Sequence, residues 1–188
     1  AILSGLRPRI VNESAYWIAH NTLLRFREAN SGTVVAEDMA IEVDAAETVK
    51  LAFYYILTEA LNNIGKHAQA DEVRVTLSCN EALFLQVVDN GRGPGAAMQS
   101  LPDLVLNHHV GVVDMHHWAR LVEGSLKIYE NPEGGTIVEL TLPLVSYLDK
   151  AMAHNGSEKG LVLLFDWPLY GTNEKQNGSP SNPAAALD

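Results

Sequence analysis

Two stretches in which apolar and polar residues alternate, residues 73–87 and 125–142, constrain the fold of this chain most strongly. The first is interrupted by Asn80-Glu81 and the second by the Asn-Pro-Glu-Gly-Gly sequence of residues 131–135, so each predicts a β-hairpin. Alternation with a period of two places apolar side chains on one face of a sheet and polar side chains on the other. We therefore expect a mostly antiparallel sheet that needs cover on one face only.

Helices are predicted to supply this cover. Residues 13–30 form the first, with apolar positions at Tyr16, Trp17, Leu23, Leu24 and Phe26. The longest begins at Asp44 as its N-cap and ends at residues 65–68, with apolar positions at Leu51, Tyr54, Leu57, Leu61 and Ile64. Short strands are expected at 33–35 and 41–43. The combination predicts an α+β fold, a two-layer α/β sandwich with a mixed, mostly antiparallel sheet and helices on one face.

The remaining segments are less regular. Residues 89–110 are rich in Gly, Pro and polar side chains and have no sustained period, which predicts a mobile loop without regular secondary structure. A further helix is expected over residues 111–123. Residues 146–188 are expected to form a variable, partly disordered tail, in which the apolar patch Leu161 to Tyr170 is the exception.

Composition excludes several kinds of partner. The 188 residues include 13 Lys and Arg against 23 Asp and Glu, and the resulting net charge of -10 argues against nucleic acid binding. No apolar run approaches the roughly 18 residues that would cross a bilayer, so we expect no membrane contact by this segment. The single cysteine, Cys79, cannot form an internal disulfide and fits a cytoplasmic location.

The first motif with chemical potential is Glu59-Ala-Leu-Asn-Asn63 on the longest predicted helix, with Lys66 and His67 one turn beyond. Residues 59 and 63 are four apart and share a face, where an amide oxygen and a carboxylate suit Mg²⁺ or an oriented water. The two basic side chains would reach phosphate oxygens. The alternative is an ordinary solvated helix face.

Two glycine motifs follow in the sequence. Asp89-Asn-Gly91-Arg-Gly93 comes directly after a predicted strand, where a carboxylate can accept a hydrogen bond from the exocyclic amine of adenine. Gly111 stands where a loop enters a helix, so the N–H groups that begin the helix are free to meet phosphates. Taken singly, the first motif also suits a plain turn and the second an ordinary helix start.

The order of these motifs, followed by Gly134-Gly135-Thr136 at the start of a strand, resembles the GHKL superfamily of ATPases. Within it, the sequence is similar to sensor histidine kinases of the nitrate-sensor and DesK type. The resemblance covers roughly residues 5–143, from Leu6-Arg7-Pro8 to the closing hairpin. It implies the Bergerat fold, with ATP bound between helices beneath a flexible lid.

The resemblance also implies roles for single residues. Asn63 would coordinate Mg²⁺, Glu59 would assist at the metal or water, and Lys66 and His67 would approach the phosphates. Asp89 would recognise adenine. Gly91, Gly93 and Gly111 would give backbone contacts, and the Thr136 hydroxyl would support the Asp89 end of the pocket. The implied catalytic set is Glu59, Asn63 and Lys66, and the implied reaction is transfer of the γ-phosphoryl group of ATP to a histidine.

Two departures from the family pattern leave alternatives open. His117 and Trp118 stand where similar kinases have an acidic residue and Arg, so the isolated domain is expected to be either an active kinase domain or a noncatalytic nucleotide-binding or docking module. An anti-sigma-type serine kinase is a third possibility. No phosphoacceptor motif is present, because His20 lacks the acidic neighbour of such motifs; we interpret it as structural.

The resemblance divides the chain into three parts. Residues 1–30 would be a linker helix from an absent dimerisation and phosphoacceptor hairpin, residues 31–145 the ATP-binding catalytic domain, and residues 146–188 the tail. The implied partners are ATP, the acceptor domain of the parent kinase and a downstream response regulator. Because such kinases dimerise through the missing hairpin, we expect this piece to be largely monomeric. A zinc site at histidines 108, 109, 116 and 117 is a minor alternative.

Overall fold

A computed structural model of the protein describes residues 12–40, 45–95, 101–106 and 110–145, and the structural statements below concern these residues. The elements in chain order are α2 (Ala15–Ala29), β1 (Val34–Met39), α3 (Glu47–Asn63), η1 (Ile64–Ala68), β2 (Glu72–Cys79), β3 (Ala82–Asp89), α4 (Leu101–Leu106), α5 (Val110–Leu121), β4 (Ser125–Glu130) and β5 (Thr136–Pro143). The short η1 is a π-helix that continues α3.

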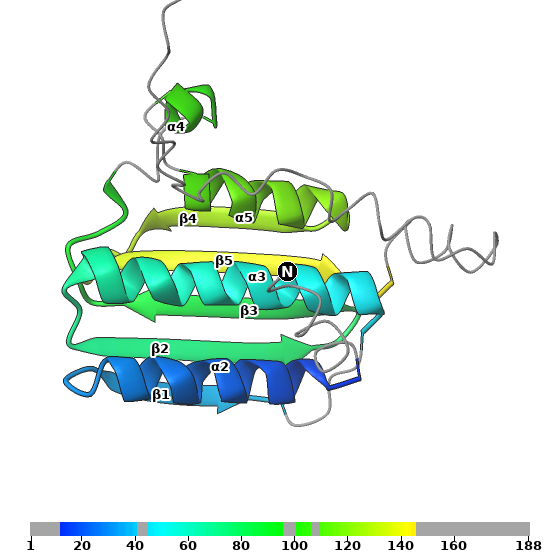
Figure 1. Ribbon diagram of the computed structural model, residues 1–188, viewed down its shortest axis with the longest axis horizontal. Coiled ribbons are helices and arrows are strands. Elements are labelled where there is room, and N and C mark those ends of the chain that lie inside the picture. The colour runs from blue at the N-terminus through cyan, green and yellow to red at the C-terminus, as the bar shows by residue number, and fades with distance from the viewer. Residues whose placement is uncertain (1–11, 41–44, 96–100, 107–109, 146–188) are drawn as a thin grey trace, which may run out of the picture.

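The five strands form one sheet in the order β1-β2-β3-β5-β4. β1 runs parallel to β2, and every other neighbouring pair is antiparallel. Both predicted hairpins are present, as β2–β3 around Asn80-Glu81 and as β4–β5, and the mixed sheet is visible in Figure 1. The predictions of two hairpins and of a mostly antiparallel sheet are confirmed.

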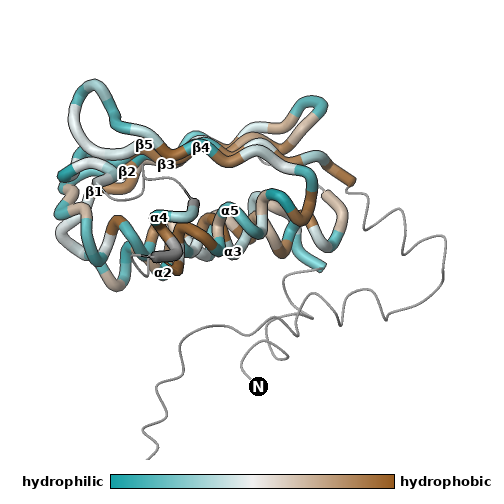
Figure 2. Tube along the Cα trace, turned by 90° about the horizontal axis from the view of Figure 1, so that it is seen from above, coloured by the Kyte–Doolittle hydropathy of each residue, from teal (hydrophilic) through white to brown (hydrophobic). Residues whose placement is uncertain are grey.

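Helices α2, α3 and α5 lie on one face of this sheet, as Figure 2 shows from above. Alternate residues of β2 and β3 face them and are buried, including Val75, Leu77, Leu85 and Val87. The core between the two layers also contains Phe53, which is fully buried on α3. The predicted two-layer α+β sandwich is therefore confirmed.

The predicted apolar stripe of the first helix is partly wrong. Ser14 caps α2 by accepting a hydrogen bond from the Trp17 N–H, and Trp17 itself and Leu24 are exposed. The buried positions are Ala15, Ile18, Ala19, Leu23 and Phe26. Tyr16-Trp17 and Leu23-Leu24 are adjacent pairs, and only one member of such a pair can face the core, since neighbours on a helix point about 100° apart. α2 belongs to the same core as the sheet.

The start of the longest helix also differs from the prediction. α3 begins at Glu47 with Ala46 in the N-cap position, and the Ala46 side chain makes no capping hydrogen bond. The predicted N-cap, Asp44, lies outside the described residues. The Ala46 N–H donates to the carbonyl of Leu144, which fastens the start of α3 to the end of β5.

The prediction that residues 89–110 contain no regular secondary structure is wrong, because α4 occupies residues 101–106. Residues 96–100 and 107–109 lie outside the described residues, as do the predicted strand at 41–43, the Leu6-Arg7-Pro8 segment and the tail from residue 146. In the parts of the chain that are described, no helix is both long and apolar enough to cross a membrane.

Candidate functional site

Glu59 and Asn63 lie one turn apart near the C-terminal end of α3, as their spacing predicted. Both are partly buried, whereas Lys66 and His67, in η1, are exposed. Both basic side chains interact electrostatically with Glu59, so all three belong to one end of the helix. The wider π-helical turn here leads to Gln69 in a left-handed conformation with a φ of 53°, which ends the helix.

The first turn of α5 lies directly against Glu59. A Cβ atom at Gly111 would overlap with the Glu59 carboxylate, so the helix and the carboxylate are this close only because residue 111 is glycine. Burial raises the pKa of Glu59, and the nearby Asp114 on α5 raises it further, while the Asn62 side chain and the two cations oppose the shift. Burial also raises the pKa of Asp114. Carboxyl groups with a raised pKa are common at functional sites.

Asp89 ends β3 and is 3% exposed, which is rare for a carboxylate. Its Oδ1 accepts a hydrogen bond of 2.8 Å from the Gly91 N–H. Among the described residues no hydrogen bond reaches Oδ2. Oδ2 is therefore the carboxylate oxygen that is open to a further donor.

Close backbone packing holds the loop that follows Asp89. The Arg92 N–H donates to the carbonyl of Ala68 at 2.9 Å, and a Cβ at Gly91 would overlap with that same carbonyl. From the other side, a Cβ at Gly135 would overlap with the carbonyl oxygen of Asp89. The two glycines therefore let η1, the loop and the start of β5 pack against one another.

The remaining predicted residues fall at the same end. The register that pairs Val88 with Ile137 places Thr136, the first residue of β5, beside Asp89. Gly93, with a φ of +88°, lies in the loop close to Gly135. In Figure 1 the end of α3, the end of β3 and the start of α5 meet at the left of the sheet. The structure thus brings together motifs that are up to 77 positions apart, from Glu59 to Thr136.

Sequence reasoning missed two asparagines that build this end. The Asn90 Oδ1 accepts from the backbone N–H groups of Asp71 and Glu72, both at 3.0 Å, and so fixes the loop to the start of β2. The Asn131 Nδ2 donates to the carbonyl of Asp89 at 3.4 Å. Asn is common in turns, so neither residue differs from an ordinary turn residue in the sequence.

Trp118, which departs from the family pattern, packs against another aromatic side chain. Its ring stacks on the ring of Tyr55 with centroids 4.6 Å apart and planes at 14°, which joins α5 to α3. Tyr55 lies one turn before Glu59 and Trp118 one turn after Asp114. The stack therefore helps to set the distance between the two helices that carry these carboxyl groups.

We expect Tyr55→Phe to reduce the loss of stability at alkaline pH. Burial, with a smaller contribution from Tyr54, raises the pKa of Tyr55 from 10.0 to about 12. The folded state therefore favours the neutral phenol, and this stability is complete below about pH 10 and lost as pH rises through about 12. After discounting for partial exposure, the loss is about 1 kcal/mol. Urea unfolding across this pH range measures it, and identical pH dependence in wild type and variant would contradict the assignment.

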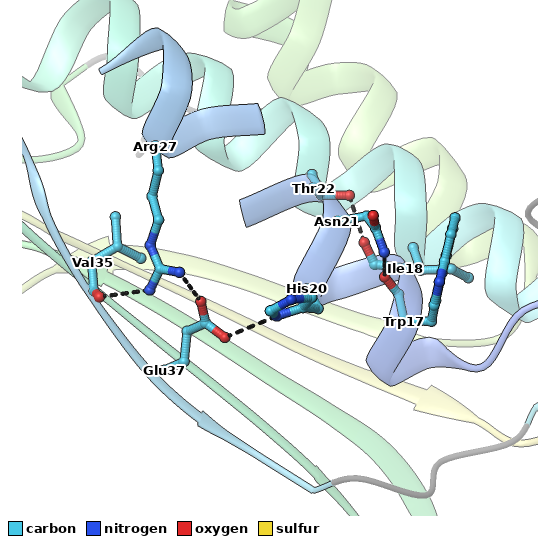
Figure 3. A network of polar contacts seen from close by, with 8 residues as sticks. All are labelled: Trp17, Ile18, His20, Asn21, Thr22, Arg27, Val35 and Glu37. Carbon is cyan, nitrogen blue, oxygen red and sulfur yellow. Dashed lines mark hydrogen bonds and ion pairs between the residues drawn. The ribbon is translucent and has the colours of Figure 1, made fainter. Parts of the chain in front are cut away.

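His20 takes part in a network on the other side of the domain. Figure 3 shows Glu37 on β1 between His20 and Arg27, both on α2. The His20 Nδ1 lies 3.5 Å from one carboxylate oxygen and the Arg27 guanidinium 2.6 Å from the other, and Arg27 also donates to the carbonyl of Val35. His20 also stacks on Tyr16. These contacts give the histidine a role in fixing α2 to the edge strand.

Histidines 108 and 109 of the zinc hypothesis lie outside the described residues. Within the described ranges, no group of three or more His, Cys, Asp or Glu side chains is arranged to hold a metal ion. Burial and the neighbouring Arg120 lower the pKa of His116.

The domain is thus an α+β sandwich with a buried carboxylate at a strand end and glycines packed around it. Residues 48–146 match the family described as histidine kinase-, DNA gyrase B-, and HSP90-like ATPase, and the chain belongs to this family. The predicted relationship to GHKL ATP-binding domains is confirmed.

Among curated relatives, the signal transduction histidine-protein kinase/phosphatase UhpB of Salmonella typhimurium is 31% identical over 147 residues, which are 76% of this chain and 27% of the relative. The nitrate/nitrite sensor protein NarX of Escherichia coli is 36% identical over 97 residues, 50% of this chain and 15% of the relative. The chain thus spans about a quarter or less of the length of these two proteins.

A solved structure with the same fold is the ATP binding domain of PrrB from Mycobacterium tuberculosis. It is 19% identical, with a TM-score of 0.54, and the match covers 70% of this chain and 94% of that one. The Erythrobacter litoralis blue-light activated histidine kinase matches with a TM-score of 0.58 at 18% identity, covering 70% of this chain and 46% of that one.

Proposed function

We propose that the chain is the ATP-binding catalytic domain of a two-component sensor histidine kinase and transfers the γ-phosphoryl group of ATP to a histidine on an acceptor domain. The observation that carries this proposal is the buried Asp89 carboxylate, with one oxygen held by Gly91 and the other without a donor among the described residues. The family match and the kinase relatives support it.

We propose that adenine donates a hydrogen bond to the Asp89 Oδ2. The exocyclic amine of adenine is a donor, and a charge-assisted hydrogen bond to a buried carboxylate contributes about 1.5–3 kcal/mol. Thr136, beside Asp89 in the sheet, is proposed to support this end with its hydroxyl. Gly91, Gly93 and Gly111 are proposed to offer backbone contacts to the nucleotide.

The phosphates and Mg²⁺ fit the other half of the site. Mg²⁺ keeps several waters and needs only one or two protein oxygens in addition to phosphate, so the Asn63 amide with Glu59 nearby is a sufficient donor set. When bound, the metal neutralises charge on the phosphates. Lys66 and His67 are exposed basic side chains at the same end and are proposed to contact phosphate oxygens. Glu59, with its raised pKa, is proposed to orient water or accept a proton.

We further propose the division of the parent protein. Residues 1–30 would lead from a dimerisation and phosphoacceptor hairpin and end in α2, which packs into the core of the catalytic domain. Residues 31–145 would be the rest of that domain, and residues 146–188 a variable tail. The partners would be that hairpin and a cytoplasmic response regulator. Because ATP and such regulators belong to the cytoplasm, we propose that this domain lies there as well.

We expect Glu59→Gln to slow phosphotransfer by about tenfold while ATP affinity stays within about threefold. Positioning and charge neutralisation supply most phosphoryl-transfer catalysis, so one proton-accepting group contributes a limited share. The measurement is the initial rate of labelled phosphate transfer from ATP to an acceptor hairpin of a related kinase. Glu28→Gln, an exposed change on α2, is the matched control. An unchanged rate in Glu59→Gln would remove Glu59 from the mechanism.

A second function has one observation in its favour. Trp118 packs on Tyr55 and is not available to contact phosphate, which suits a nucleotide-binding module without turnover. Such a module would bind ATP through Asp89 but leave the supplied acceptor hairpin unlabelled. Labelling of the acceptor hairpin that is slowed in Glu59→Gln would favour the kinase over the module without turnover.

A further inference from the structure

A groove of about 380 Å³ lies between α2 and α3, next to the candidate site, with which it shares Lys66. The two helices run in the same direction and lie side by side in Figure 1. Phe26 and Ala29 line the groove from α2, and Tyr54, Thr58 and Leu61 line it from α3. Its volume falls within the range of small-molecule pockets, about 300–1,000 Å³.

The floor of the groove is apolar. Phe26 is 7% exposed and Leu61 is 2% exposed, while the Tyr54 ring is partly buried beside them. An aromatic or aliphatic body seated here would cover the parts of Tyr54 and Ala29 that are still in contact with water, which favours binding.

Two cations line the same groove. Arg25 and Lys66 are both exposed, and among the described residues no carboxylate lies within ion-pair distance of either. This is unusual in a chain with a net charge of -10, where acidic side chains outnumber basic ones. One anionic group on a bound molecule would pair with these cations.

The groove also contains a polar group in need of a partner. The Thr58 Oγ1 is buried and has no hydrogen-bond partner within the described part of the chain. Leaving a buried hydroxyl without a partner is unfavourable, because the group has lost its hydrogen bonds to water. A polar atom between the body and the anionic group of a ligand would reduce that cost.

We propose that this groove is a second ligand site, which binds a small amphiphile with an aromatic or aliphatic body and one anionic group. Phe26, Tyr54 and Leu61 contact the body, and Arg25 and Lys66 pair with the anion. The groove adjoins the candidate site, because Lys66 lines it and also interacts electrostatically with Glu59. Variants that test it therefore belong on α2, away from the nucleotide.

The test uses anilinonaphthalene sulfonate, an aromatic body with one sulfonate, titrated into the folded chain and followed by fluorescence. Arg25→Gln removes the rim charge, and Ala29→Leu fills the groove with a residue that helices accept. Each is expected to weaken the dye about tenfold. Arg120→Gln, the same charge change at an exposed position on α5, is the matched control and is expected to stay within about twofold.

Circular dichroism establishes that each variant is folded. Saturable dye binding that Arg25→Gln and Ala29→Leu both weaken, and that Asp89→Asn leaves unchanged, would support the groove even if the chain failed to bind ATP. Dye affinity that is the same in wild type, Arg25→Gln and Ala29→Leu would overturn the proposal. So would loss of dye binding in Asp89→Asn together with unchanged dye affinity in Arg25→Gln, because the dye would then occupy the nucleotide site.

Discussion

Asp89→Asn is expected to lower the affinity for ATP about 1,000-fold with little effect on folding. The asparagine Oδ1 can still accept from the Gly91 N–H, so the loop keeps its shape. The second atom changes from an acceptor to a donor and faces the donating amine of adenine. Losing a charge-assisted hydrogen bond and burying two opposed donors together cost about 4 kcal/mol, which is about three powers of ten in affinity.

Calorimetric titration with ATP and Mg²⁺ measures the effect of Asp89→Asn. Asp38→Asn, a change of the same type at an exposed position on β1, is the matched control and should bind as wild type does. An Asp89→Asn protein that is folded and binds ATP within about threefold of wild type would contradict the role of this carboxylate.

Gly135→Ala is expected to destabilise the domain by at least about 3 kcal/mol. Residue 135 has a φ of +95°, where an L side chain is strained, and its added Cβ would overlap with the carbonyl of Asp89 and approach the Gly91 N–H. The clash is with backbone on both sides, so no rotamer change can relieve it. A small domain has only about 5–15 kcal/mol of net stability, so this loss is a large part of it.

Gly134→Ala is the control that distinguishes backbone strain at positive φ from steric overlap of the added Cβ. Its φ of +100° is similar, but an added Cβ meets nothing within 4 Å. This control should lose only about 1–2 kcal/mol. Urea unfolding of the two variants gives the comparison, and equal losses would show that the close packing of Gly135 on Asp89 contributes no stability beyond backbone conformation.

Much of the fold could be predicted because its signals are local. The alternation in residues 72–79 and 82–89 and the turn between them defined β2 and β3 almost to the residue. The stripe of α3 identified its buried face. Trp17 and Leu24 were assigned wrongly because adjacent apolar residues leave the orientation of a helix open until its partner is known. α4 lies in a segment whose composition favours a loop.

The candidate site could be predicted as a set of residues but not as an arrangement. Asp89 and Glu59 lie in short patterns that resemble a family, and the structure places them at one end of the sheet. The contact of Gly111 with Glu59 joins residues 52 positions apart, and that of Gly135 with Asp89 joins residues 46 apart. Such contacts depend on the sheet order, which no local pattern contains. Asn90 and Asn131 were missed for the same reason.

The most direct test of the central claim is a calorimetric comparison of ATP with inosine triphosphate on the wild-type chain. The two nucleotides differ only in the purine, where a carbonyl replaces the amine that Asp89 would accept from. We predict that inosine triphosphate binds at least about 100-fold more weakly, since its carbonyl would face a buried carboxylate. Equal affinity for the two nucleotides would show that Asp89 does not recognise adenine and would contradict the account.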